Sequence, residues 1–244
     1  MVRINKFLAS CNLGSRREVE KYVINGKISI NGQICHDLAS QIDPDKDTVK
    51  FLNKIIKPTT EKIYILLNKP TNYIVSLKDE LARKTVSELL PDLDIHLFPV
   101  GRLDYKSEGL LIFTNDGYFA NSIIHPRYKL PKVYRVKINK NLTQEELKRL
   151  RNGLFIDGKK TLPAKVFIKK SHPGAEELRI TLFEGRNRQI RKMLKSVSAE
   201  VLKLRRLQIG NLKLGDLPRG MWRFLNDYEV DELLKMAKTK RGKE

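Results

Sequence analysis

Residues 101–111 read Gly-Arg-Leu-Asp-Tyr-Lys-Ser-Glu-Gly-Leu-Leu, and this stretch says more about the fold than any other. A short, continuous apolar run at residues 110–113 is typical of a strand covered on both faces. Gly109 lets the chain turn into this strand, so we expect Asp104 on a loop that feeds a sheet. Judged alone, an Asp near Gly and Ser most often caps a turn. The alternative is a reactive carboxylate at the end of a buried strand.

The composition indicates a polyanionic partner. The chain has 244 residues, enough for one large and one small domain, with 48 Lys and Arg against 28 acidic residues and a formal net charge of +20. Nucleic acid is the first expectation for such a charge. The longest apolar runs, residues 63–67 and 109–113, are far too short to span a bilayer, so we expect no membrane partner.

Cysteine and histidine usage argues against a disulfide framework or a metal site. The chain has two cysteines, Cys11 and Cys35, and its four histidines lie far apart in sequence. The first seven residues lack the continuous apolar segment of a signal peptide. We therefore expect a cytoplasmic protein without a metal site.

The N-terminal segment is predicted to form two helices and a hairpin. Apolar residues share one helical face over residues 3–10, and Ser15 and Glu18 have the spacing of a capping box that begins a second helix. Asn25-Gly26 ends that helix, and an alternating strand at residues 28–30 runs into a tight turn at Asn31-Gly32. Basic side chains are scattered over this module: Arg3, Lys6, Arg16, Arg17, Lys21 and Lys27. They form either a solvated surface or a set of phosphate contacts.

Residues 53–62 lose periodicity and contain Pro58, so the linker is placed there, with domains at 1–60 and 61–244. In the second domain strands alternate irregularly with helices, which indicates an α+β fold around a largely antiparallel sheet. The expected strands are 63–68, 110–114, 132–138, 164–168 and 178–183. The expected helices begin at a capping box at Thr143 and cover 187–195 and 227–237.

Three motifs resemble the RsuA/RluB family of bacterial ribosomal pseudouridine synthases. Residues 101–111 resemble its catalytic motif, whose essential Asp falls on Asp104. Lys-Val-Tyr-Arg-Val at 132–136 places the family's active-site Tyr on Tyr134, which without the resemblance could equally be a Tyr packed on a sheet. Residues 184–193 place the basic partner of the Asp on Arg191, although spacing alone leaves Arg186 and Arg188 open.

The resemblance extends to the N-terminal module. Residues 14–18 and 25–32 are similar to the alpha-L RNA-binding domain that is shared with a small-subunit ribosomal protein. The Gly-Ser-Arg-Arg-Glu and Glu-Gly-Arg-Asn-Arg-Gln motifs resemble the large-subunit branch, RluB-like or RluF-like, more than the small-subunit branch. The five residues after Asp104, Tyr-Lys-Ser-Glu-Gly, differ from the commonest RluB sequence at this place, which leaves the target uridine open.

The resemblance implies a reaction without cofactor or metal, in which uracil is detached from its ribose, rotated and rejoined through carbon. Asp104 would act as nucleophile or as base, Arg191 would pair with it in a bidentate fashion, and Tyr134 would stack on the extruded base. Residues 185–206 hold eight basic side chains and one acidic one, a density that bound phosphate would relieve. The expected RNA contacts of the second domain are Arg102, Arg186, Arg188, Lys192, Arg205 and Arg206.

Other functions stay open on the sequence alone. The expected partner is ribosomal RNA or a ribosomal assembly intermediate, bound by a monomer. A non-catalytic assembly factor would show erosion at Asp104, Tyr134 or Arg191, and all three positions are occupied by the expected residue types. The same reaction on small-subunit 16S rRNA rather than 23S rRNA is a further alternative. A metal-dependent nuclease is disfavoured because it needs several converging carboxylates.

Overall fold

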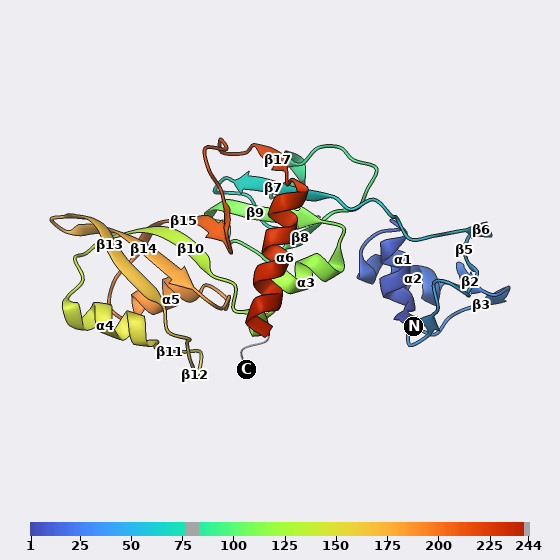
Figure 1. Cartoon of the computed structure of the whole chain (residues 1–244), viewed down its shortest axis with the longest axis horizontal. Coiled ribbons are helices and arrows are strands. Elements are labelled where there is room, and N and C mark those ends of the chain that lie inside the picture. Colours follow the sequence, from blue (N-terminus) through green and yellow to red (C-terminus); the bar gives the residue numbers. More distant parts are fainter. Residues whose placement is uncertain (77–82, 242–244) are drawn as a thin grey trace. The chain divides into compact units, whose positions relative to one another are not determined.

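The computed structural model describes residues 1–76 and 83–241, and the chain divides into two compact units (Figure 1). The first unit contains Met1–Ile63 and Asp92–Leu97, and the second contains Tyr64–Pro91 and Phe98–Glu244. Within the described ranges, no helix combines the length and the apolar character that crossing a membrane requires.

Two short helices form the core of the first unit. Helix α1 spans Ile4–Ser10 and α2 spans Arg16–Ile24. The predicted capping box is confirmed: the Ser15 hydroxyl accepts from the Glu18 amide at 3.3 Å, and the Glu18 carboxylate accepts from the Ser15 amide at 2.9 Å. The helices bury an apolar cluster that includes Ile4, Leu8 and Val19. Burial of this face, rather than helix propensity, stabilises such short helices.

The predicted hairpin at Asn31-Gly32 is confirmed, since strands β2 (Ile28–Ile30) and β3 (Gln33–Ile34) pair across it. Both turn residues have positive φ, 51° and 89°, as a tight hairpin turn needs. Strands β5 (Val49–Phe51) and β6 (Lys54–Ile55) extend the sheet in the order β3-β2-β5-β6. Strand β6 lies in the segment that we expected to be a linker. Strand β1 (Val2–Arg3) pairs separately with β4 (Gln41–Ile42).

Residues 92–97 return to the first unit through Asn12. The Asn12 side-chain amide donates to the Asp94 carbonyl at 2.7 Å, and its oxygen accepts from the His96 amide at 2.5 Å. Asn12 has a left-handed backbone with φ 63°, which Asn tolerates better than most residues. Sequence periodicity showed no sign of this long-range contact, which crosses more than 80 residues of chain.

One sheet of nine strands organises the second unit, in the order β13-β14-β10-β15-β9-β7-β17, with β16 beside β15 and β8 beside β9 (Figure 1). Adjacent strands run antiparallel except β15 and β9, so the predicted α+β fold with a largely antiparallel sheet is confirmed. The strands are β7 (Tyr64–Lys69), β8 (Phe98–Val100), β9 (Glu108–Thr114), β10 (Lys132–Ile138), β13 (Lys165–His172), β14 (Ala175–Leu182), β15 (Val201–Ile209), β16 (Leu212–Lys213) and β17 (Trp222–Phe224). A separate hairpin joins β11 (Phe155–Ile156) to β12 (Lys159–Lys160).

The parallel contact between β9 and β15 depends on Gly109. This glycine has φ 108°, and a Cβ there would collide with the Arg206 carbonyl oxygen. Gly109 is therefore already part of the strand. It permits a close backbone approach, whereas the sequence suggested a turn that leads into the strand.

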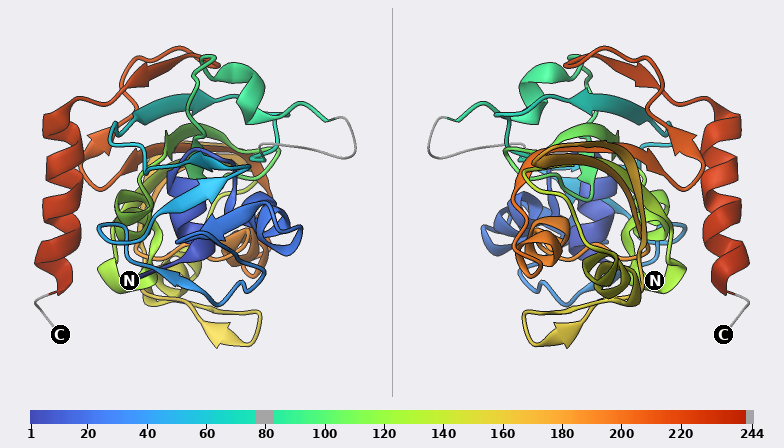
Figure 2. Two further views of the ribbon diagram at one scale, coloured as in Figure 1. Left: turned by 90° about the vertical axis from the view of Figure 1, so that its right-hand side faces the viewer. Right: turned by 90° about the vertical axis from the view of Figure 1, so that its left-hand side faces the viewer.

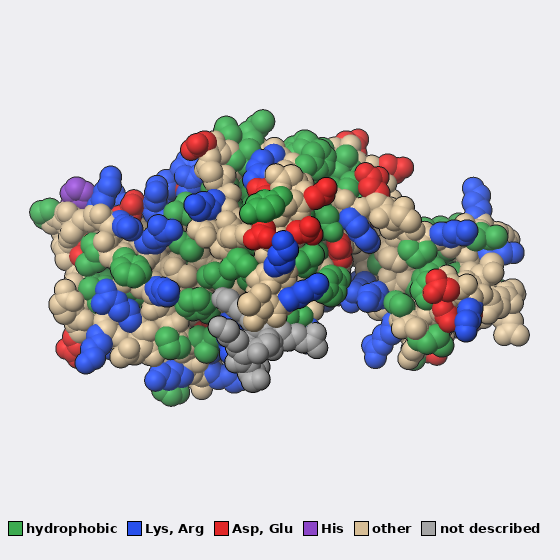
Figure 3. Space-filling view, in the orientation of Figure 1, with side chains coloured by type: hydrophobic (Ala, Val, Ile, Leu, Met, Phe, Trp, Pro, Cys, Tyr) green, Lys and Arg blue, Asp and Glu red, His purple; other side chains and the backbone are tan. Residues whose placement is uncertain are grey.

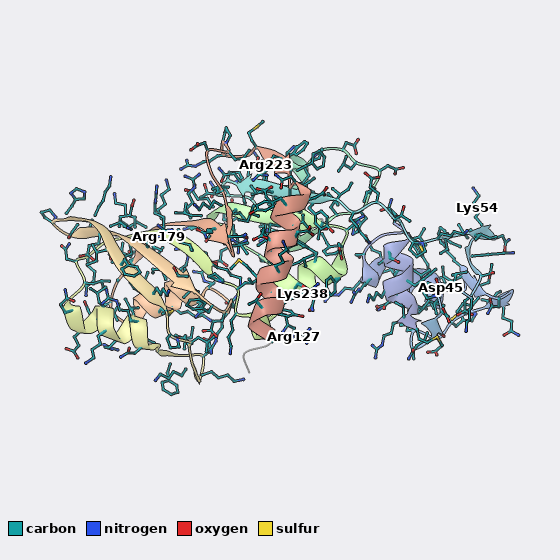
Figure 4. The ribbon with its side chains drawn as sticks, in the orientation of Figure 1. Asp45, Lys54, Arg127, Arg179, Arg223 and Lys238 are labelled. Carbon is teal, nitrogen blue, oxygen red and sulfur yellow. The ribbon has the colours of Figure 1, made fainter. Side chains whose placement is uncertain are left out.

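Helices cover the buried side of this sheet. The predicted capping box at Thr143 is confirmed at the start of α4 (Gln144–Asn152). Helix α6 (Asp227–Arg241) continues four residues beyond the expected end. At the start of α6, both terminal nitrogens of Arg223 donate to the Glu229 carboxylate, at 2.7 and 2.6 Å (Figure 4). The helical elements are η1 (Val86–Leu89), α3 (Gly117–Ile124), η2 (Pro126–Tyr128), α4 (Gln144–Asn152), α5 (Gln189–Lys195) and α6 (Asp227–Arg241). Figure 2 shows α4 and α5 on one side of the arch formed by β13, β14 and β10.

Candidate active site

Asp104 lies on the loop between β8 and β9, as the sequence predicted. Its carbonyl accepts from the Ser107 amide at 2.9 Å, which closes a turn, and its side chain is 29% exposed. Strand β9 behind the loop is buried at every residue. The carboxylate therefore projects from a rigid support into a cavity of about 330 Å³.

The cavity walls come from five segments distant in sequence. Tyr134 from β10 is buried and lines the cavity together with Asp104. Arg206 of β15 lies beside it in strand register. Apolar walls surround these polar groups, and the cavity residues from the sheet and from α3 include Val100, Ile123, Leu182, Leu204 and Ile209. A flat aromatic or heterocyclic ring would be desolvated well here.

The cation paired with Asp104 is Arg188. A terminal guanidinium nitrogen of Arg188 lies 3.8 Å from the Asp104 carboxylate. Arg188 immediately precedes α5 and has a left-handed backbone, φ 51° and ψ 31°, which is uncommon for a residue with a side chain. Such backbone strain is often found at functional sites. Arg188 thus meets Asp104 through a long-range contact that sequence spacing did not reveal.

Arg191 lies near Asp104 without the predicted bidentate pairing. Its two terminal nitrogens donate to the carbonyls of Val201, at 3.2 Å, and Lys106, at 3.3 Å. Burial, and secondly the charge of Arg188, lower the pKa of Arg191, while Asp104 acts in the opposite direction. Arg191 therefore joins the Asp104 loop to β15, and its buried Nε has no hydrogen-bond partner among the described residues.

Lys69 binds the backbone of the Asp104 loop, and it was not among the site residues predicted from the sequence. Its side chain is fully buried, and its ammonium donates to the carbonyls of Pro70 at 2.9 Å, Asp104 at 3.3 Å and Ser107 at 2.9 Å. Burial lowers the pKa of Lys69 to about 8; the Asp104 and Glu108 charges oppose this shift, and Arg206 adds to it. The sequence signal that could have identified it is a lysine between the expected apolar strand, residues 63–68, and Pro70.

Glu108 is a second missed charge at the site. It is buried and forms ion pairs with Lys203 at 3.4 Å and with Arg219 at 3.2 Å. These contacts join the first residue of β9 to β15 and to the segment that precedes β17. Buried carboxylates normally require such partners.

The predicted RNA contacts of the first unit are all exposed. Lys27 also lies over the Tyr22 ring, with its ammonium 5.8 Å from the ring centroid. The remaining side chains are available to solvent, as phosphate ligands must be. These six residues are Arg3, Lys6, Arg16, Arg17, Lys21 and Lys27.

The predicted RNA contacts of the second unit divide into two groups. Arg102 and Arg188 are exposed and line the cavity. Arg206 is buried, whereas Arg186 and Lys192 are partly exposed, and the side chains of all three bind other groups of the protein. Arg186 donates to Glu184 and to the Lys159 and Lys160 carbonyls, Lys192 pairs with Asp157, and Arg206 donates to the Leu110 carbonyl at 2.7 Å. Arg205 is half-buried.

No group of three or more His, Cys, Asp or Glu side chains suited to hold a metal ion exists among residues 1–76 and 83–241. The ionisable side chains that line the cavity are instead one carboxylate, one phenol and several cations. Such a set can bind a polyanion and position a nucleophile or base next to a ring.

Known proteins match both parts of the chain. The family described as RNA pseudouridylate synthase matches residues 63–196, and the S4 domain family matches residues 2–48. A ribosomal large subunit pseudouridine synthase B from Bacillus subtilis is 34% identical over 97% of each chain. The dual-specificity RNA pseudouridine synthase RluF from Escherichia coli is 36% identical over 96% of this chain and 79% of its own.

A relative from Aquifex aeolicus, described as an uncharacterized RNA pseudouridine synthase, is 41% identical over 96% of this chain and 94% of its own. A crystal structure of a pseudouridylate synthase superposes with a TM-score of 0.70 and 27% identity, covering 96% of this chain and all of that one. The carboxylate, the tyrosine and the arginines described above fall on the motifs that carried the resemblance. This chain belongs to the RNA pseudouridine synthases of the RsuA family, with an S4 domain ahead of the catalytic domain.

Proposed function

We propose that this enzyme isomerises uridine to pseudouridine in ribosomal RNA, at a site in the 23S RNA of the large subunit. One observation carries the chemistry: Asp104 projects from the loop in front of a buried strand into a cavity that it shares with Tyr134 and Arg188. The RNA class rests on the Bacillus subtilis relative, a large-subunit enzyme that matches over 97% of both chains.

The size of the cavity suits one nucleoside. Pockets for small ligands begin at about 300 Å³, and this cavity measures about 330 Å³. A uridine must leave its base stack to enter it, at a cost of a few kcal/mol that is smallest in loops and bulges. Basic side chains at the rim, among them Arg102 and Arg188, would hold the flanking phosphates.

Within the cavity Asp104 would act on the ribose, as nucleophile at its anomeric carbon or as base. The bond from uracil nitrogen to the anomeric carbon breaks, the base rotates, and a new bond forms from ring carbon five to the same sugar carbon. Ring carbon five then gives up its proton and the detached nitrogen gains one, so no atom is added or lost overall. Tyr134 would stack on the free base and exchange a proton through its hydroxyl. Arg188 would orient the Asp104 carboxylate, and Arg191 and Lys69 would fix its loop.

Replacement of the carboxylate tests the chemistry. Asp104→Asn preserves volume and removes the reactive charge, so isomerisation should fall by at least a thousandfold while RNA affinity stays within about threefold. Tritium release from uridine labelled at ring carbon five measures turnover, and filter binding measures affinity. Asp216→Asn is the matched control, because Asp216 is exposed and does not line the cavity. Turnover of the Asp104 variant within tenfold of the wild type would rule out the assignment.

Mapping of pseudouridines tests the substrate. Cells that lack this protein should lose pseudouridine from 23S rRNA, and the modification should return with the wild-type chain but not with Asp104→Asn. A lost site in 16S rRNA would instead assign the enzyme to the small subunit. If no site is lost while assembly slows, the chain is an assembly factor.

A further inference from the structure

The sheet of the second unit has a second basic surface, on the face opposite the cavity. Side chains alternate along β10: Tyr134 and Val136 are buried toward the cavity side, whereas Arg135 and Lys137 are exposed. Strand β14 follows the same alternation, with Leu178 and Ile180 buried and Arg179 exposed. Helices α4 and α5 cover the buried side, so the exposed residues point away from them (Figure 2).

Like charges stand directly opposite one another on this surface. In strand register, Arg135 faces Arg179 on one side and Arg205 on the other, while Lys137 faces Lys203 on one side and Glu177 on the other. Directly opposed like charges destabilise a sheet. Among the described residues, two carboxylates offset these positive charges. Glu177 lies 3.6 Å from Arg135, and the buried Glu108 pairs with both Lys203 and Arg219. A role in fold stability therefore does not explain this row of cations.

Two more observations indicate a ligand. The Nε of Arg205 is buried and has no hydrogen-bond partner in the described structure. Phe167 of β13 stands in register beside Arg179 and is 53% exposed, an unusual place for a large aromatic side chain. We call this set the outer basic face: Arg135, Lys137, Phe167, Arg179, Lys203 and Arg205.

Adjacent strands of a sheet lie about 4.8 Å apart, so cations on neighbouring strands form a row that can follow a phosphate backbone. An exposed aromatic ring next to such a row is the combination that stacks an unpaired base. Figure 3 shows Lys and Arg side chains gathered over β13 and β14, and Figure 4 places Arg179 on these strands. An acidic protein partner would match the charge but would give no reason for the solvent-exposed ring beside Arg179.

We propose that the outer basic face binds a single-stranded segment of the substrate RNA, separate from the segment whose uridine enters the cavity. The inference rests on the proposed function, since it takes RNA as the substrate. Contacts on both faces of one sheet would let the enzyme recognise a folded rRNA domain, which a short hairpin cannot reproduce.

The test compares two double variants of the full chain. Lys137→Gln/Arg179→Gln removes two charges from the outer basic face, and Lys148→Gln/Arg149→Gln removes two exposed charges from α4 as a matched control. Binding to an rRNA domain transcript is measured as a function of salt. Two lost phosphate contacts should reduce the log-log salt slope by about 1.4 units, against an unchanged slope for the control. Phe167→Ala should weaken binding about tenfold without changing the slope.

Turnover on a short substrate hairpin should stay within twofold of the wild type for all three variants, because none of them touches the cavity. The melting temperature of Lys137→Gln/Arg179→Gln should stay close to that of the wild type, because Arg135 and Lys203 lose opposed like charges and Glu177 keeps its ion pair with Arg135. Equal salt slopes for the two double variants would overturn the proposal. It would also be overturned if Lys137→Gln/Arg179→Gln lost binding to an acidic ribosomal protein while its RNA binding stayed intact. The slope is measured without turnover, so failure of the proposed reaction would be seen separately, in the hairpin assay.

Discussion

At the scale of single residues, the site depends on cations held in unusual environments. Lys69 is fully buried below the Asp104 loop, and Arg188 has a left-handed backbone where it meets Asp104. Desolvation of a cation is costly unless its hydrogen bonds are satisfied. Three carbonyls satisfy Lys69, and two of them, those of Asp104 and Ser107, belong to the loop that carries the reactive carboxylate. The energetic cost of burial is thus linked to the position of Asp104.

Lys69→Met should lower kcat about tenfold and leave RNA affinity unchanged, because the loop carbonyls lose hydrogen bonds worth about 1–3 kcal/mol. A pH series of chemical denaturation identifies the cause. The pKa of Lys69 is about 8 in the folded chain and 10.5 in the unfolded chain, so the unfolded state binds more protons between these values. Wild-type stability relative to Lys69→Met should therefore rise from pH 8 to 10.5. A constant difference over this range would mean that the ammonium is not desolvated.

The two arginines near Asp104 should differ in kinetics. Arg191 donates to the Lys106 carbonyl, two residues from Asp104, so Arg191→Met should reduce kcat by roughly tenfold to a hundredfold. On an Asp104→Asn background the same change should cost little more, because residues that act as a unit are non-additive. If the effects of Arg191→Met and Asp104→Asn are fully additive, while Arg188→Met and Asp104→Asn are strongly coupled, Arg188 is the functional partner of Asp104.

At the scale of elements, the parallel pairing of β9 and β15 holds the site together. Strand β15 supplies Arg206 to the cavity and Lys203 to Glu108, while β9 follows the Asp104 loop. The two strands approach closely at Gly109, where the Arg206 backbone occupies the space of a side chain. This junction sets the distance from the carboxylate to the tyrosine on β10.

Gly109→Ala should therefore destabilise the second unit by about 3 kcal/mol, through positive φ and a backbone clash together. Gly158→Ala is the matched control, since Gly158 has φ 74° and a Cβ added there would meet no atom within 4 Å. It should cost about 1 kcal/mol, from backbone strain alone. Denaturant unfolding measures both values. Similar costs for the two variants would show that β15 can move away from β9.

At the scale of the whole molecule, charge is shared between the two units. Residues 1–60 contain ten basic and six acidic side chains, a net charge of +4, which leaves +16 for the rest of the chain. The larger charge favours RNA binding by the catalytic unit without help. The S4 domain should then contribute to the choice of target more than to overall affinity.

Arg16→Gln/Arg17→Gln tests this division of labour. Both residues are exposed at the start of α2, and their loss should slow modification of a structured rRNA domain about tenfold while turnover on a short hairpin stays within twofold. Lys54→Gln/Lys57→Gln removes two exposed charges elsewhere in the same unit and serves as control. Equal losses on both substrates would show that the first unit affects folding rather than targeting.

Features that depend on near neighbours in the chain could be predicted from the sequence. The capping boxes at Ser15 and Thr143, the hairpin at Asn31-Gly32 and strand β10 were all predicted, because each is specified within a few residues. The Asp104 motif was also identified, since its eleven residues are contiguous. Local backbone preferences and side-chain periodicity are sufficient for such features.

The cations that serve the site, in contrast, became apparent in the folded chain alone. Lys69 meets Asp104 across 35 residues and Arg206 meets Leu110 across 96, and both are buried although charged residues are normally expected at the surface. The pairing of β9 with β15, the return of residues 92–97 and the choice of Arg188 beside Asp104 are likewise long-range. A buried cation is stable only where distant backbone carbonyls converge on it, and that convergence exists only once the sheet has formed.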